Sequence, residues 1–193
     1  MKYVAIDIGN VCIAIDKTAF LHGIGLTQDT VLPPSVHDSV KKLEFGMISE
    51  NKFFEQLAAL PECRNINKEQ IIALYDSILL APVTGMKELL LELPQMGVTP
   101  IFFSDISTFH LKGCYERFPE MRRFDGIFSF DYGAYKPDKI LFDAFEKKYG
   151  KPLVYTDDRS ELIDGALKNN WNAHRFVSAE ILKEQIIQAL EKI

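Results

Sequence analysis

Five short apolar runs, separated by segments whose apolar residues have helical spacing, constrain the fold most strongly. The runs lie at residues 3–8, 98–104, 126–130, 153–156 and 173–177. Most of them are nearly continuous apolar runs rather than alternating ones, which is typical of strands buried on both faces of a parallel sheet. Parallel strands need right-handed crossover connections, which are usually helices. The sequence therefore predicts an α/β fold built on a parallel sheet.

Residues that commonly begin or end helices flank the segments between the runs. We expect Pro137 to begin a helix that Gly150 ends, and Ser160 and Ser178 to cap two more helices. We expect Thr84 to cap a further helix, which the proline ten residues later ends or kinks.

The alternation of runs and helices breaks between residues 8 and 98. A simple crossover needs far fewer residues. Segments 49–60 and 67–80 have apolar residues at helical spacing, and Asn67 and Gln70 form a capping-box pair. We therefore expect residues 17–82 to be a helical insertion at the carboxyl edge of the sheet, and residues 1–16 and 83–193 to form the α/β core domain.

The composition is that of an ordinary globular chain, with 193 residues of which 47% are hydrophobic and 25% charged. The net charge is −5 and the basic residues are not clustered, so we expect no nucleic-acid or membrane partner. Asp7 interrupts the first apolar run too early for a signal peptide, and no run reaches the ~20 residues that span a bilayer. Cys12, Cys63 and Cys114 lack metal-ligand spacing and are expected to be free thiols. We expect a cytoplasmic protein.

Four of the five runs end near notable polar residues, and strand ends of a parallel sheet meet at one crevice. These residues are Asp7, Ser104, Asp105, Lys136, Asp157 and Asp158. Individually each has an ordinary interpretation, such as a turn aspartate or a solvated lysine. Together, however, carboxylates in one crevice repel each other unless a cation neutralises them. Mg²⁺ uses one or two carboxylates and holds substrate phosphate, so the pattern favours phosphoryl transfer to an aspartate.

Four motifs occur in order over nearly the whole chain: "AIDIGNV", "IFFSDIS", "YKPD" and "VYTDDRSELIDGA". In this the chain resembles the haloacid dehalogenase-like (HAD-like) hydrolase superfamily, most of whose members are Mg²⁺-dependent phosphatases. It is most similar to the D-x-G-N-V subgroup, which includes bacterial phosphatases acting on sugar phosphates such as α-D-glucose 1-phosphate. The stretch "EFGMISENKFFEQL" resembles a pattern in the caps of that subgroup. The resemblance implies a Rossmann-like three-layer α/β/α core with an inserted α-helical cap.

The resemblance also implies roles for residues near the nucleophile. Asp7 takes the position of the nucleophile and Mg²⁺ ligand, and Gly9 would offer its backbone carbonyl to the metal. Ser104 and the backbone of Asp105 would hold phosphate, and Lys136 would pair with both the nucleophile and the phosphoryl oxygens.

For the late metal ligand the resemblance makes Asp158 the first choice, with Asp157 as the alternative. Successive strand side chains point in opposite directions, so only one of the two is expected to reach the metal directly. Glu161 occupies the position of a further acid that would orient water at the metal. The cap residues considered for substrate selectivity are His22, His37, Lys41, Lys42 and Phe45.

Two positions depart from the family pattern. Most of its phosphatases have, two residues after the nucleophile, an aspartate that acts as general acid, whereas this chain has Gly9. Asp16 could substitute, although a turn residue is the favoured interpretation. Asp105 stands where the subgroup often has asparagine, and a carboxylate beside phosphate is unfavourable unless it is neutralised or points away.

The prediction is a Mg²⁺-dependent phosphomonoesterase that acts on a small phosphorylated metabolite, for example a sugar phosphate, through an aspartyl-phosphate. One alternative is a 2-haloacid dehalogenase-type hydrolase, in which the aspartate attacks carbon without Mg²⁺. Another is a catalytically impaired HAD-fold protein that binds a ligand or partner. The protein is expected to be a monomer or homodimer.

Overall fold

A computed structural model describes residues 2–26 and 33–192. Its main sheet is parallel and has the order β5-β4-β1-β6-β7. The strands are β1 (Lys2–Ile6), β4 (Val98–Ser104), β5 (Gly126–Phe128), β6 (Val154–Asp157) and β7 (Ala173–Arg175). All five predicted runs contain a strand, so the predicted α/β class with a parallel sheet is confirmed. β1 ends two residues earlier than predicted, so that Asp7 lies in the loop beyond it.

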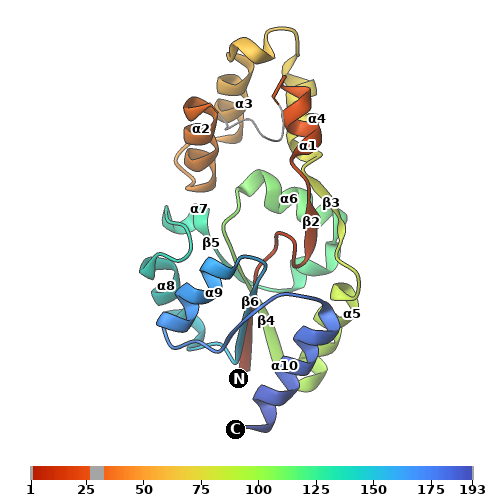
Figure 1. Cartoon of the computed structure of the whole chain (residues 1–193), viewed down its shortest axis with the longest axis vertical. Helices are drawn as coiled ribbons and strands as arrows, with labels where there is room; N and C mark the ends of the chain where they lie inside the picture. Colours follow the sequence, from red (N-terminus) through yellow and green to blue (C-terminus); the bar gives the residue numbers. More distant parts are fainter. Residues whose placement is uncertain (1, 27–32, 193) are drawn as a thin grey trace.

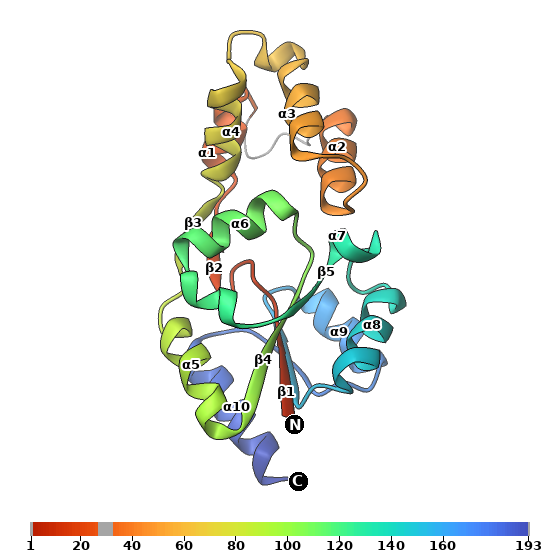
Figure 2. The same cartoon turned by 180° about the vertical axis from the view of Figure 1, so that it is seen from behind.

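Helices cover both faces of this sheet, which makes three layers (Figures 1 and 2). One face packs on α5 (Met86–Glu92) and α10 (Ala179–Glu191), and the other on α8 (Lys139–Tyr149) and α9 (Ser160–Lys168). The side chains of β1 alternate accordingly: Val4 and Ile6 join the first apolar cluster, whereas Ala5 joins the second. Burial on both faces is why these strands appear as continuous apolar runs in the sequence.

Four further helical elements belong to the core. They are η2 (Leu93–Met96), α6 (Thr108–Arg117), η3 (Pro119–Arg123) and α7 (Ser129–Tyr132). α6 and α7 follow β4 and β5 directly, at the carboxyl edge of the sheet.

Predicted helix ends are partly correct. Ser178 caps α10 by accepting a hydrogen bond from the Ile181 backbone, and α8 ends at Gly150. Other predicted ends were wrong: Asp138 caps α8 by accepting from the Ile140 backbone, and the N-cap position of α9 is Arg159, whose side chain makes no capping hydrogen bond. α5 is preceded not by a capping threonine but by Gly85, whose φ of +79° is left-handed and accessible to glycine.

A helical lobe, formed by α1–α4, stands above the carboxyl edge of the sheet (Figure 1). Its elements are α1 (Thr18–Gly23), α2 (Pro34–Glu44), α3 (Glu50–Ala58), η1 (Pro61–Cys63) and α4 (Lys68–Asp76). They share an apolar cluster separate from the two clusters of the sheet, around Phe20, Phe53, Leu57 and Ile71. The Asn67/Gln70 capping box is present at α4. We propose that this lobe is the cap, with the division at residues 17–82 predicted above.

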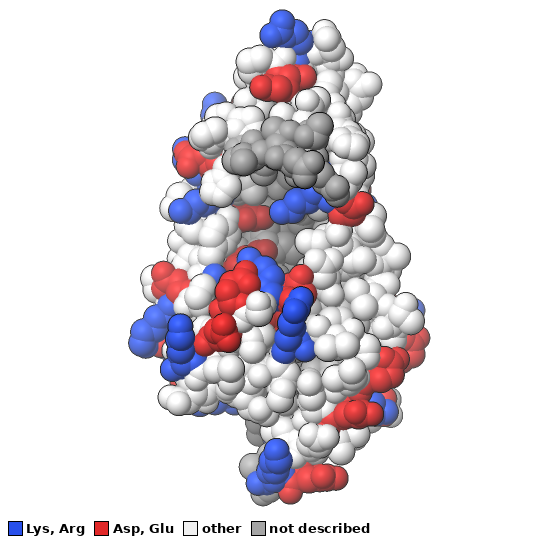
Figure 3. Space-filling view, viewed as in Figure 1, with Lys and Arg blue, Asp and Glu red and all other residues white. Residues whose placement is uncertain are grey.

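Two short antiparallel strands, β2 (Ile13–Ile15) and β3 (Leu79–Pro82), connect the lobe to the core. The sequence did not indicate this pair: residues 79 and 80 were assigned to the end of a helix, but α4 stops at Asp76. None of the helices in the described ranges is long and apolar enough to cross a membrane. Acidic and basic side chains are interspersed on the face in Figure 3, and both signs meet where the lobe faces the sheet.

Candidate active site

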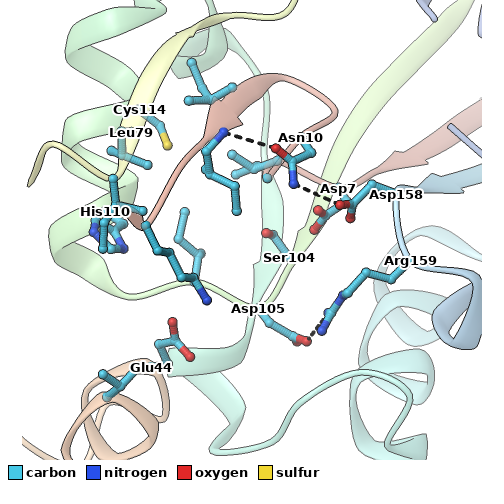
Figure 4. A pocket seen from close by; sticks show the side chains of 18 of the residues that line it. Asp7, Asn10, Glu44, Leu79, Ser104, Asp105, His110, Cys114, Asp158 and Arg159 are labelled. Carbon is cyan, nitrogen blue, oxygen red and sulfur yellow. Dashed lines mark hydrogen bonds and ion pairs between the residues drawn. The ribbon is translucent and has the colours of Figure 1, made fainter. Parts of the chain in front are cut away.

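A cavity of about 430 Å³ lies between the carboxyl edge of the sheet and the helical lobe. Loops of the core contribute one wall, and the lobe contributes the other (Figure 4). The core residues at the cavity include Asp7, Gly9, Asn10, Ser104, Asp105, Lys136, Asp158 and Arg159, and the lobe residues include Lys17, Phe20, Leu21, Val40, Glu44 and Tyr75. The residues predicted from separate strand ends therefore meet in one place.

The loop after β1 positions Asp7 and Asn10. The backbone N–H of Asp7 still donates to the Thr156 carbonyl, at 3.1 Å, so Asp7 is fixed against β6. Asn10 has a left-handed φ of +53°, which asparagine tolerates better than most residues. Its side chain accepts from the Ile15 backbone N–H and donates to Asp158 Oδ2, at 3.1 Å and 3.0 Å. Asn10 thus connects the first motif to the last, a role that the sequence analysis did not assign.

The Lys136 ammonium is fully buried between two carboxylates. Its Nζ lies 2.8 Å from Asp7 Oδ1 and 2.6 Å from Asp157 Oδ2, and it donates to the Phe103 carbonyl at 2.8 Å. Burial alone would lower the pKa of Lys136, but the charges of Asp7 and Asp157 raise it well above its usual value. Lys136 is therefore a structural cation of the site rather than a solvated lysine.

The ionised form of Asp7 remains unfavourable although Lys136 lies beside it. Burial, opposed by Lys136 and reinforced by Asp157, raises the pKa of Asp7 from 3.8 to about 6. The Ser104 hydroxyl, at the buried end of β4, hydrogen-bonds to Asp7 and lowers its pKa slightly. Ser104 is not the cap of the following helix, since Ser107 caps α6.

The two late aspartates have different surroundings. Asp157 is completely buried, and protein donors occupy both of its oxygens: Lys136 and the Tyr155 hydroxyl on Oδ2, and the Arg159 N–H on Oδ1. Asp158 is half-buried and lines the cavity, where Asn10 holds its Oδ2. Asp157 thus holds Lys136, and Asp158 faces the ligand space.

The donor set suits a hard divalent cation. Asp7, Asp157 and Asp158 offer carboxylate oxygens that lie within 4.8 Å of one another. Asp7 Oδ2 is directed toward Gly9, since a Cβ built on Gly9 would lie 3.8 Å from it. Carboxylate, carbonyl and water oxygens are the ligands of Mg²⁺, so the residues present fit this ion. Asp7 and Asp158, with the Gly9 carbonyl, are the groups that could hold it.

Asp105 is neutralised by protein donors. Its Oδ1 accepts from the Lys136 backbone N–H at 2.9 Å, and its Oδ2 from Arg159 Nη2 at 3.0 Å. Burial raises the pKa of Asp105, and Lys136 and Arg159 oppose this shift. The predicted repulsion between Asp105 and phosphate is therefore offset by the guanidinium of Arg159, which also lines the cavity. Arg159 was missed, although a basic residue directly after two acids at a strand end was a readable signal.

Several other predicted residues lie elsewhere. Asp16 accepts the Thr18 N–H at 2.8 Å and is an exposed turn residue, as favoured. Glu161 is exposed on the first turn of α9, outside the cavity lining. The exposed cap residues considered for selectivity also lie outside that lining: His22, His37, Lys41 and Lys42. Phe45 packs against Tyr135, with ring centroids 4.5 Å apart, and its neighbour Glu44 lines the cavity.

No protein-family model and no curated protein matches the sequence. Solved structures do resemble the chain. A HAD-family enzyme from Bacteroides thetaiotaomicron, in its magnesium complex, has a TM-score of 0.76 at 20% identity, over 92% of this chain and 94% of that chain. A predicted HAD-like family hydrolase from Porphyromonas gingivalis gives 0.74 at 17% identity, over 98% of each chain. The chain has the HAD fold.

Proteins with this HAD fold support different chemistries. The Bacteroides enzyme in complex with magnesium and inorganic phosphate gives a TM-score of 0.73 at 18% identity, over 92% of this chain and 95% of that chain. An L-2-haloacid dehalogenase from Xanthobacter autotrophicus, with chloropropionic acid covalently bound, gives 0.58 at 14% identity, over 97% and 83%. The chemistry of this chain must therefore be argued from its own residues.

Proposed function

We propose that this protein is a Mg²⁺-dependent phosphomonoesterase of the HAD-like hydrolase superfamily, acting through an aspartyl-phosphate. The observation that carries the proposal is the convergence of Asp7, Lys136 and Asp158 at one cavity, with carboxylate oxygens spaced for a divalent cation. That a HAD-fold neighbour is crystallised with magnesium and phosphate supports it. The dehalogenase alternative needs no cation, and so leaves this acid set without a role.

In the proposed reaction Asp7 attacks phosphorus through a carboxylate oxygen, and the P–O bond to the leaving group breaks. Lys136 holds Asp7 in place through the 2.8 Å contact at Oδ1 and supplies positive charge beside the phosphoryl oxygens. Ser104 and Arg159 line the same space and can donate hydrogen bonds to those oxygens. Mg²⁺ held by Asp7, Asp158 and the Gly9 carbonyl would neutralise the charge that develops on the phosphoryl group.

The cavity limits the substrate class. About 430 Å³ is a volume typical of small-molecule sites. Its lobe wall has an apolar part, formed by Phe20, Leu21 and Val40, and a polar part that includes Glu44 and Lys17. A small phosphorylated metabolite such as a sugar phosphate fits this combination, and we propose no nucleic-acid or membrane partner.

The test is hydrolysis of p-nitrophenyl phosphate and a panel of sugar phosphates, each with Mg²⁺ and with EDTA. We expect turnover only with Mg²⁺, and loss of turnover in Asp7→Asn. The matched control is Asp164→Asn, an exposed aspartate on α9, which should retain wild-type activity. Phosphate release that persists in Asp7→Asn would refute the assignment of Asp7 as the nucleophile. Chloride release from a haloacid without Mg²⁺ would instead favour the dehalogenase.

A further inference from the structure

Hydrolysis of an alkyl phosphate requires a proton for the departing oxygen, because an alkoxide is a poor leaving group. A positioned acid typically contributes about 10²–10⁴ in rate. Gly9, which lies beside Asp7, has no proton to give. The source of that proton must therefore be sought among the other groups that line the cavity.

Among the described residues, four acids line the cavity: Asp7, Glu44, Asp105 and Asp158. Asp7 is the proposed nucleophile and Asp158 the proposed metal ligand. Both oxygens of Asp105 already accept hydrogen bonds, from Lys136 and Arg159. Glu44 is different, because the hydrogen-bond donor on its carboxyl is a neutral hydroxyl, that of Tyr135, at 2.5 Å on Oε2.

The end of α2 that carries Glu44 is anchored to the core. The Ser129 hydroxyl lies 2.8 Å from the Glu44 carbonyl oxygen and accepts the Ile106 N–H at 3.0 Å. At Gly46, where φ is +67°, a Cβ would lie 2.5 Å from the Phe130 carbonyl oxygen. Only glycine allows the lobe to approach α7 so closely. The Glu44 backbone is thereby fixed beside the residues that follow β4 and β5.

Two consecutive residues of one loop, Tyr135 and Lys136, contact Glu44 and Asp7 on opposite sides of the cavity. Tyr135 donates to Glu44 Oε2, and the next residue, Lys136, donates to Asp7 Oδ1. In Figure 4 the Glu44 carboxyl points into the cavity from α2, and Ser104 and Asp105 lie between it and the Asp7/Asp158 pair. A substrate phosphoryl group hydrogen-bonded to Ser104 would therefore have Asp7 on one side and Glu44 on the other, toward the lobe. Since the nucleophile and the leaving group lie on opposite sides of phosphorus, the leaving group must lie on the side of Glu44.

The surroundings of Glu44 favour its protonated form. Burial raises the pKa of Glu44 above its usual value, and the nearby charge of Asp105 raises it further. The Tyr135 hydrogen bond and the charges of Lys17 and Arg159 oppose this shift without cancelling it. Tyr75 of α4 also faces Glu44, and the Glu44 charge raises the pKa of the Tyr75 hydroxyl.

We propose that Glu44 of the helical lobe is the general acid and base of the reaction. When Asp7 attacks phosphorus, the electron pair of the breaking P–O bond moves to the leaving oxygen, and the Glu44 carboxyl gives that oxygen its proton. The products are the alcohol, the aspartyl-phosphate and the Glu44 carboxylate. A water in the place of the leaving group then loses a proton to Glu44 and attacks phosphorus. The P–O bond to Asp7 breaks and its electron pair stays on the Asp7 oxygen, so that inorganic phosphate leaves, Asp7 is again a carboxylate and Glu44 is again protonated. The inference rests on the proposed phosphatase function.

The experiment measures kcat/KM against pH for a series of phosphate esters, from p-nitrophenyl phosphate to simple alkyl phosphates. Because p-nitrophenolate leaves without a proton, Glu44→Gln should reduce its turnover far less than that of alkyl phosphates, for which we expect a loss of about 10²–10⁴. The decline at high pH, where Glu44 loses its proton, should disappear in Glu44→Gln. The matched control is Glu62→Gln, an exposed glutamate of the lobe, which should behave as wild type.

Other outcomes separate the two proposals. Tyr135→Phe removes the hydrogen bond that holds Glu44 but keeps the carboxyl, so it should retain wild-type sensitivity to the leaving group and shift the decline to higher pH. An equal loss for all esters in Glu44→Gln would make Glu44 a structural contact between lobe and core and overturn the inference alone. If the wild type shows no turnover of p-nitrophenyl phosphate that depends on Asp7, the phosphatase function itself is wrong and the inference falls with it.

Discussion

Asp7→Asn should stabilise the metal-free protein at pH 8 while it abolishes turnover. The side chain of Asp7 is only 10% exposed, and its pKa is raised from 3.8 to about 6, mainly by burial. A group whose pKa is higher in the folded state stabilises the fold below pH 3.8, and this contribution is lost as the pH rises through about 6. Two pKa units correspond to roughly 3 kcal/mol. Asparagine resembles the neutral acid and can still accept from Lys136, so the variant avoids this penalty at pH 8.

The measurement is thermal unfolding of wild type and Asp7→Asn in EDTA, at pH 4.5 and pH 8. For a chain of this length, about 3 kcal/mol corresponds to roughly 6–12 °C in Tm. We expect this gain at pH 8, little gain at pH 4.5, and a smaller gain with Mg²⁺, which favours the ionised Asp7. Asp164→Asn should show no gain at either pH. A variant that is no more stable than wild type at pH 8, or equally stabilised at both pH values, would refute the claim that Asp7 is a strained, ionised carboxylate.

Three further substitutions test other contacts of the site. Lys136→Met removes the buried cation between Asp7 and Asp157, so it should reduce the free energy of unfolding by about 3–5 kcal/mol in denaturant titrations at pH 8 and abolish turnover. Arg159→Met removes the partner of Asp105 and should raise KM for phosphate esters more than it lowers kcat, and adding Asp105→Asn should recover part of the lost affinity. In a Glu44→Gln background, Gly9→Asp should restore part of the alkyl phosphatase activity, because a Cβ at this glycine would meet only ordinary contacts, at 3.5 Å and beyond.

The sequence predicted the sheet because its strands are buried on both faces. Val98–Ser104 is mostly apolar for this reason, and its bounds are correct. Strands β2 and β3 were missed because each has only one buried residue and so forms no buried apolar run, and because the two strands are far apart in the chain. Each strand is stabilised by pairing with the other, and the whole lobe lies between them in the sequence. No local sequence pattern predicts that pairing. Boundaries also shifted where apolar residues continue beyond a strand, as at Ile8.

For the site, the sequence could place acids at strand ends but could not assign their individual contacts. Asp157 and Asp158 are adjacent, yet one is enclosed by protein donors and the other faces the cavity. Alternation along a strand predicted that the two side chains would point in different directions. Which of them contacts Lys136 depends on where the Lys136 ammonium is buried, and the sequence does not show that. Glu44 lay in a recognisable stretch, but its position over the cavity depends on how α2 docks on the core, through Ser129 and Gly46. Such docking is a tertiary property.

The charge balance at the bottom of the cavity connects stability with function. Asp7, Lys136 and Asp157 bring two negative charges and one positive charge together where little solvent can screen them. Asp157 has the lower pKa of the two acids because the Lys136 charge, the Tyr155 hydroxyl and the Arg159 N–H outweigh its burial. The uncompensated charge therefore resides on Asp7, which faces the cavity. A bound cation would remove this imbalance, so the same charge that destabilises the metal-free fold at high pH would strengthen the binding of Mg²⁺ in the proposed reaction.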